Sequence, residues 1–130
     1  MTEPRPDLFA YGTLQFDEVL QALLGRVPRH APDRAPDWRA AALERRLYPG
    51  LVAGPGAAAP GALLTGLSAR EWAILDAYED DQYELREITL ASGRRCLTYV
   101  WEGGEVLDAD WDAEEFRVRH LRAYAEQMRP

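Results

Sequence analysis

The chain has 130 residues, of which 47% are hydrophobic and 28% are charged, a composition typical of globular proteins that excludes disorder of the whole chain. The formal net charge of −7 disfavours phosphate backbones and anionic surfaces, so we expect neither nucleic acid nor a membrane as a partner. No apolar run has the length of a signal peptide or a membrane span, and the single cysteine, Cys96, can form no internal disulfide. We therefore expect one cytoplasmic domain over residues 1–130, as a monomer or a homodimer.

The N-terminal part of the sequence predicts a strand, a turn and a helix. Leu8 begins a short apolar strand that runs to Gly12, and a glycine at the end of a strand indicates a turn or a close approach of the backbone. Asp17–Leu24 is predicted to be a helix because its apolar residues recur at helical spacing, and Gly25 is placed to end it.

The middle of the chain is rich in proline, glycine and alanine. Arg26–Asp37 contains several prolines and is predicted to be a loop, and Pro49–Pro60 is predicted to be a mobile connector of small residues. Trp38–Tyr48 is ambiguous, because its alanines favour a helix whereas the strand predicted next, Gly61–Leu67, fits a strand or a bent hairpin arm before it. We prefer the strand.

Clearer signals follow in the second half. Ser68 and Glu71 have the spacing of a capping box and predict a helix that runs to about Tyr78. Tyr83–Leu90 and Arg95–Trp101 are rich in β-branched and aromatic residues and are separated by a short turn, so they predict a hairpin.

The C-terminal segment predicts a turn and a final helix. Gly103 and Gly104 form the turn, and Asp112 is expected to cap the helix with Glu115 in the reciprocal position. The inner face of this helix is predicted to consist of Phe116, His120, Leu121, Tyr124, Ala125 and Met128. The order of elements predicts an α+β fold, with a small mixed β-barrel or curved sheet and flanking helices.

Several kinds of site are excluded by the motifs that the sequence lacks. It contains no phosphate-binding loop, no dinucleotide-binding glycine pattern and no nucleophile elbow. Neither His30 nor His120 has a companion at the spacing of metal ligands, so no metal site is expected. A carboxylate is therefore the best candidate for acid–base chemistry.

Glu79 is the carboxylate that the pattern favours. It directly follows the helical stripe formed by Trp72, Leu75 and Tyr78 and stands four residues after Leu75, so the apolar face of the helix continues into it. Partial desolvation there would raise its pKa towards the range in which a carboxyl group shuttles protons. The alternative from periodicity is a glutamate at the helix end that points into water.

Two motifs together resemble those of a known family. The first is Tyr11-Gly12-Thr13-Leu14, after the first predicted strand, and the second is Leu75-Asp76-Ala77-Tyr78-Glu79, followed by Tyr83 and Arg86. They are similar to the loop after the first strand and to the second motif, in which the glutamate is essential, of the γ-glutamylcyclotransferase-like family, in its avirulence-induced-gene-like branch. The resemblance extends over about Leu8 to Trp101.

The resemblance implies a small mixed barrel with a cleft at the strand ends and an enzyme that needs no cofactor. Such an enzyme releases an amine or amino acid from a small γ-glutamyl compound and closes the glutamyl part into 5-oxoproline. Glu79 would then be the general acid and base. The expected substrate-binding residues are Tyr11, Gly12, Thr13, Leu14, Tyr83, Arg86 and Tyr99.

Two other functions remain open from the sequence. The same fold could serve as a non-catalytic module that binds a small ligand or a protein, or it could remove a γ-glutamyl group from a biosynthetic intermediate. The sequence does not specify the amine half of the substrate.

Overall fold

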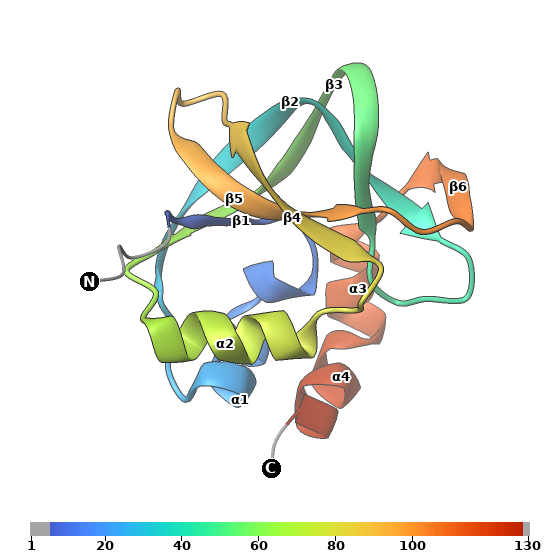
Figure 1. The fold of residues 1–130 in the computed structure, drawn as a ribbon. Coiled ribbons are helices and arrows are strands. Elements are labelled where there is room, and N and C mark those ends of the chain that lie inside the picture. The colour runs from blue at the N-terminus through green and yellow to red at the C-terminus, as the bar shows by residue number, and fades with distance from the viewer. Residues whose placement is uncertain (1–5, 129–130) are drawn as a thin grey trace.

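The computed structural model of the protein describes residues 6–128. The described chain forms six strands, four α-helices and one 3-10 helix, η1 (Figure 1). In chain order the elements are β1 (Leu8–Ala10), η1 (Thr13–Gln15), α1 (Asp17–Leu24), β2 (Arg29–Leu43), β3 (Gly50–Thr65), α2 (Ala69–Tyr78), β4 (Tyr83–Thr89), β5 (Arg95–Trp101), β6 (Val106–Asp110), α3 (Ala113–Arg119) and α4 (Leu121–Met128).

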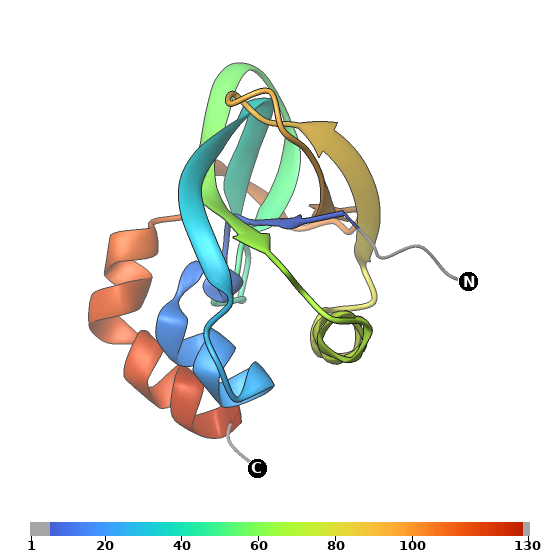
Figure 2. The ribbon, with the colours of Figure 1, turned by 90° about the vertical axis from the view of Figure 1, so that its left-hand side faces the viewer.

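The six strands form one mixed sheet in the order β4-β5-β1-β3-β2-β6. Strand β5 runs parallel to β1 and also pairs with the start of β3, where Leu51 lies opposite Val100, so the sheet curls into a half-barrel (Figure 2). Helices α1, α2 and α4 lie below the sheet in Figure 1, and α3 leads down to α4. The predicted α+β fold with a curved sheet and flanking helices is confirmed.

Alternation along the strands divides the buried residues into two clusters. Leu8 and Ala10 of β1 pack towards the helices, where they meet Trp72, Leu75 and other apolar side chains. Phe9, between them, faces the inside of the curl together with residues such as Leu51 and Val100. This two-residue period is the geometry of a strand that is covered on both faces.

The helix signals in the sequence correspond to the observed ends. Gly25 ends α1 in the left-handed conformation with φ of 78°. At the start of α2 the Ser68 side chain accepts a hydrogen bond from the Glu71 backbone N–H, and the Glu71 side chain accepts one from the Ser68 N–H, so the capping box is complete.

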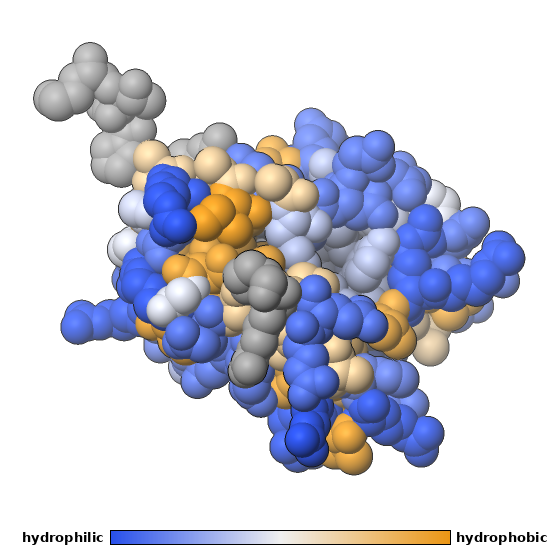
Figure 3. Space-filling model, turned by 90° about the horizontal axis from the view of Figure 1, so that it is seen from below, coloured by the Kyte–Doolittle hydropathy of each residue, from blue (hydrophilic) through white to orange (hydrophobic). Residues whose placement is uncertain are grey.

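Seen from below, the helical side is largely hydrophilic, with a hydrophobic strip exposed at its surface (Figure 3).

Two loop predictions were wrong. Most of Arg26–Asp37 belongs to β2, and Pro49–Pro60 is largely β3, so the two segments form a long antiparallel hairpin. The prolines of β2, Pro32 and Pro36, are tolerated because β6 pairs with β2 only from Ala41 to Leu43, so the preceding part of β2 lies on an edge of the sheet. A bulge at Asp37, where φ is 66°, bends the hairpin.

Three further segments agree with the sequence-based predictions only in part. The strand preferred for Trp38–Tyr48 is confirmed as far as Leu43. Strand β6 was not predicted, and it pairs with the end of β2. The single C-terminal helix was wrong in one respect, because the backbone leaves helical geometry at His120 and divides it into α3 and α4. Asp112 caps α3 by accepting a bond from the Glu115 N–H.

Within residues 6–128, no helix is both long and apolar enough to span a membrane.

Candidate active site

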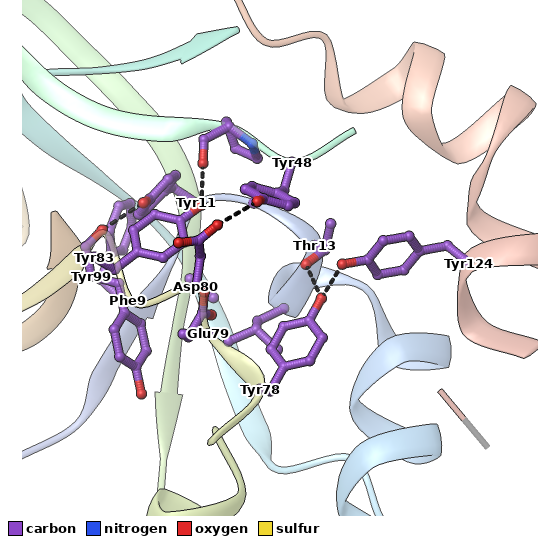
Figure 4. A pocket seen from close by; sticks show the side chains of 14 residues that line it. Phe9, Tyr11, Thr13, Tyr48, Tyr78, Glu79, Asp80, Tyr83, Tyr99 and Tyr124 are labelled. Atoms are coloured by element: carbon purple, nitrogen blue, oxygen red, sulfur yellow. Dashed lines mark hydrogen bonds between the residues drawn. The ribbon is translucent and has the colours of Figure 1, made fainter. Parts of the chain in front are cut away.

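A pocket opens at the C-terminal end of β1, between the sheet, the end of α2 and helix α4 (Figure 4). It contains about 470 Å³ of empty space, part of which is open to solvent. Half of the residues that line it are aromatic. The lining residues are Phe9, Ala10, Tyr11, Gly12, Thr13, Leu14, Tyr48, Pro49, Tyr78, Glu79, Asp80, Tyr83, Tyr99 and Tyr124.

One wall is the turn from Tyr11 to Leu14. A Cβ atom on Gly12 would lie 2.9 Å from Cγ and Cδ of Pro49, so only glycine allows this close approach. The turn continues into η1, where the Gln15 N–H donates to the Gly12 carbonyl oxygen. The N–H groups at the start of a helix have no partner within it, so those of Gly12, Thr13 and Leu14 are the groups of this wall suited to hold an anion.

Glu79 stands at the opposite wall, as the C-cap of α2. Its backbone is extended, and its N–H donates to the Leu75 carbonyl oxygen at 3.1 Å, which turns the side chain from the helix into the pocket. Burial, and to a smaller extent the negative charges of Asp80 and Asp76, raise the pKa of its carboxyl group from 4.5 to about 8. No group of residues 6–128 donates a hydrogen bond that would stabilise the charged form.

The phenol groups of Tyr11 and Tyr83 are held by backbone atoms. The Tyr11 hydroxyl donates to the Tyr99 carbonyl oxygen at 2.5 Å and accepts from the Leu51 N–H at 3.1 Å. The Tyr83 hydroxyl donates to the Pro49 carbonyl oxygen at 2.5 Å. Burial is the main cause that raises the pKa of both phenols, and Glu79 contributes in the same direction, so both stay neutral. Their arrangement fixes the floor of the pocket.

A second set of hydroxyl groups connects three elements. The Tyr78 hydroxyl, at the end of α2, is bonded to Thr13 Oγ1 of η1 at 2.8 Å and also to the Tyr124 hydroxyl of α4 (Figure 4). The C-terminal helix therefore supports both the glycine-bearing turn and the end of α2 that presents Glu79.

Asp80 occupies the rim of the pocket beside Glu79. Its Oδ2 atom accepts a hydrogen bond from the Tyr48 hydroxyl at 2.7 Å, and its Oδ1 atom accepts one from the Gln82 N–H at 2.9 Å. These bonds hold the pKa of Asp80 below its ordinary value, with the Gln82 N–H as the largest cause. Two adjacent carboxyl groups are thus driven in opposite directions by their surroundings.

The structure brings seven of the eight residues expected at the site around one pocket. These are Tyr11, Gly12, Thr13, Leu14, Glu79, Tyr83 and Tyr99. The Tyr99 hydroxyl donates to Asp76 Oδ1 at 2.7 Å.

Arg86 is the one expected residue that lies apart from the others. It does not line the pocket, and its exposed guanidinium pairs with Glu84 at 3.1 Å and Glu102 at 2.6 Å on the outer side of the β4–β5 hairpin. Alternation along β4 explains this position, since Tyr83 turns inwards and Arg86, three residues later, turns outwards.

Sequence reasoning missed several pocket residues, among them Tyr48, Asp80 and Tyr124. Tyr48 lies in a turn whose course depends on the β2–β3 hairpin, and Tyr124 was interpreted only as part of the inner face of a helix. For these three residues, the one signal in the sequence that could have indicated a place in the pocket was that Asp80 directly follows Glu79.

The structure thus combines a curled mixed sheet with a pocket in which a desolvated carboxyl group lies opposite a glycine-bearing turn. The sequence model of the family described as gamma-glutamyl cyclotransferase, AIG2-like, matches residues 8–115, and the chain belongs to this family.

Relatives and solved structures agree with this assignment. AIG2-like protein D of Arabidopsis thaliana is 30% identical over 125 residues, which cover 90% of this chain and 82% of the relative. A solution structure of an Arabidopsis thaliana protein has a TM-score of 0.73 at 24% identity, covering 98% of this chain and 82% of that one. A solved gamma-glutamyl cyclotransferase has a TM-score of 0.60 at 14% identity, covering 95% and 85%, and shares the fold.

Proposed function

We propose that this protein is a cyclotransferase that releases an amine or amino acid from a γ-glutamyl compound by intramolecular cyclisation to 5-oxoproline. The proposal rests above all on the Glu79 carboxyl group, which is desolvated, faces a pocket and has a pKa raised to about 8. A carboxyl group with a pKa near the working pH both accepts and returns a proton efficiently. Family membership supports the same reaction class.

The proposed reaction needs one base and one acid, and Glu79 serves as both. Its carboxylate takes a proton from the substrate's α-ammonium group, and the freed α-nitrogen attacks the γ-carbonyl carbon. A bond forms between these two atoms, the bond from the carbonyl carbon to the leaving nitrogen breaks, and Glu79 returns the proton to that nitrogen. The ring nitrogen, which still carries two protons after the attack, loses one of them to solvent. The products are 5-oxoproline and the free amine, and no water is consumed.

The opposite wall supplies the complementary groups. The N–H groups of Gly12, Thr13 and Leu14 would hold the α-carboxylate of the glutamyl group or the oxyanion that develops at the γ-carbonyl. The phenol groups, held by backbone bonds, shape a pocket that keeps the glutamyl chain folded for attack. Such positioning adds to the acid–base contribution, because the reaction is intramolecular.

Replacement of Glu79 by glutamine tests this function. We expect Glu79→Gln to fold normally and to release 5-oxoproline from a panel of γ-glutamyl dipeptides and amines about 10²–10⁴-fold more slowly, since that is the usual value of general acid–base catalysis. Glu84→Gln is the matched control, because it makes the same change at an exposed position of β4 outside the pocket. Glu84→Gln is expected to keep the parent rate.

The same experiment separates catalysis from simple binding. A Glu79→Gln protein as active as the parent would contradict the mechanism. If the panel binds to the parent protein, as measured by an increase in melting temperature, but none of its members is turned over, the pocket is a non-catalytic binding module.

A further inference from the structure

The side chains with carboxyl groups that line the pocket have no basic side chain among them. Among the described lining residues, Glu79 and Asp80 are acidic and none is arginine or histidine. The Arg46 guanidinium, which does not line the pocket, is bonded to Glu105 and lies over the Trp101 ring, 5.0 Å from its centroid, and its charge also acts on Tyr48 and Asp80. Glu105, which bonds the guanidinium directly, takes up part of its positive charge.

Asp80 has no part in the proposed proton transfer, yet it is fixed in place. The Tyr48 hydroxyl and the Gln82 N–H hold its two oxygen atoms at 2.7 and 2.9 Å, and they favour the ionised form. Each carboxylate oxygen has a second lone pair that remains available to a ligand. The rim thus presents an oriented negative charge beside the residue that would protonate the leaving nitrogen.

The glutamyl half of the substrate does not satisfy this charge. Its α-ammonium group is assigned to Glu79 and its α-carboxylate to the N–H groups of the opposite wall, so both charges of the glutamyl half already have partners in the proposed function. Asp80 then remains for the other half of the molecule, the amine that is released.

We propose that Asp80 selects γ-glutamyl compounds whose amine half carries a second positive charge, such as a diamine, and that it discriminates against amine halves that end in a carboxylate. This inference rests on the proposed function and adds the substrate class. A charge-assisted hydrogen bond between an ammonium group and a carboxylate is stronger than a neutral one. A carboxylate at the same place would meet repulsion from Asp80.

The aromatic walls favour the same class of ligand. Tyr48 and Tyr83 lie with ring centroids 6.1 Å apart at this side of the pocket, and both line it. The faces of phenol rings attract cations, and the methylene chain of a diamine packs against them. The Tyr48 ring therefore supports the amine chain while its hydroxyl orients Asp80.

Three matched substrates test the inference. The γ-glutamyl derivatives of diaminobutane, pentylamine and aminopentanoate have the same four-methylene chain and differ only in a terminal ammonium, methyl or carboxylate group. We expect kcat/KM to be at least about tenfold higher for the diaminobutane derivative than for the pentylamine derivative, and lowest for the aminopentanoate derivative. The preference should decrease as salt is added, since the rim is partly exposed.

Asp80→Asn shows whether Asp80 causes the preference. We expect the ratio of kcat/KM between the diaminobutane and pentylamine derivatives to fall to near one in this variant, whatever its overall rate. Asp108→Asn, an equal change of charge at an exposed position of β6, should keep the parent ratio. Equal use of the three substrates by the parent protein, or an undiminished ratio in Asp80→Asn, would overturn the inference and leave the proposed function standing.

A binding measurement keeps the two proposals distinguishable. The three compounds are titrated calorimetrically into Glu79→Gln, in which turnover is expected to be about 10²–10⁴-fold slower. Tighter binding of the diaminobutane derivative, lost when Asp80→Asn is added, upholds the role of Asp80 even if the parent protein releases no 5-oxoproline. Equal or no binding of all three contradicts it.

Discussion

Glu79 and Asp80 illustrate how two neighbouring carboxyl groups acquire different properties. Glu79 is desolvated and receives no hydrogen bond from residues 6–128, so its pKa rises to about 8. Asp80 accepts hydrogen bonds from the Tyr48 hydroxyl and the Gln82 N–H, so its pKa falls. The fold thereby separates a proton carrier from a permanent charge at adjacent positions in the sequence.

The pH dependence of the reaction follows from the pKa of Glu79. Attack requires the carboxylate form, which makes up about a tenth of the molecules one pH unit below the pKa. We expect kcat/KM for a γ-glutamyl amine to rise about tenfold per pH unit between pH 6 and 7 and to level near pH 8. Steady-state rates of 5-oxoproline release measure this limb, and a profile that is flat or falls between pH 6 and 8 would be incompatible with Glu79 as the base.

At the scale of elements, the pocket depends on contacts between segments that are distant in the sequence. The end of α2 carries Glu79, the turn after β1 carries Gly12, and α4 reaches both through the hydroxyl groups of Tyr78, Thr13 and Tyr124. The last helix is thus part of the support for the site.

Two variants measure the contribution of this connection. Tyr124→Phe removes one hydrogen bond of the Tyr78 hydroxyl, and we expect it to lower the free energy of unfolding by about 1 kcal/mol. Tyr78→Phe removes both bonds and should lower it by about 2 kcal/mol, with a larger increase in KM because the Thr13 turn loses its partner. Urea unfolding and substrate titration measure these effects. Equal losses of unfolding free energy in the two variants would argue against a series of hydrogen bonds that passes through the Tyr78 hydroxyl.

For the whole molecule, the buried acids predict how stability depends on pH. The pKa of Glu71 is lowered to about 2, mainly by its hydrogen bonds with Arg26, so this contribution to stability is lost as the pH falls from about 4.5 towards 2. The pKa of Glu79 is raised, so the folded protein holds a proton that the unfolded chain releases, and stability falls as the pH rises from about 4.5 to 8. The net negative charge of the protein also grows as the pH rises, and the repulsion within it lowers stability in the same direction.

We therefore expect the highest melting temperature near pH 5, with a decline on both sides. Glu79→Gln should be close to the parent at pH 5 and more stable than it at pH 9, because glutamine has no proton to release. Thermal unfolding followed by circular dichroism between pH 3 and 9 measures both curves. If the two proteins decline in parallel above pH 5, the Glu79 carboxyl group is not desolvated in the folded state.

The sequence by itself determined the features that depend on neighbouring residues. The glycine after β1, the complete capping box of α2, the β4–β5 hairpin and the family motifs were legible because turns, caps and alternation are local properties. These signals were sufficient to propose Glu79 and the Tyr11–Leu14 turn, and the structure places both at one pocket.

Only the tertiary structure decided which segments pair and which side chains share the pocket. Arg26–Asp37 and Pro49–Pro60 have the composition of loops, yet they are strands because each supplies the other's hydrogen-bonding partners across a long hairpin. Tyr48 and Tyr124 reached the site, and Arg86 did not, because the curl of the sheet and the docking of α4 set their directions. The pKa of Glu79 belongs to this second group, since desolvation depends on every element that encloses the carboxyl group and not on the residues beside it in the chain.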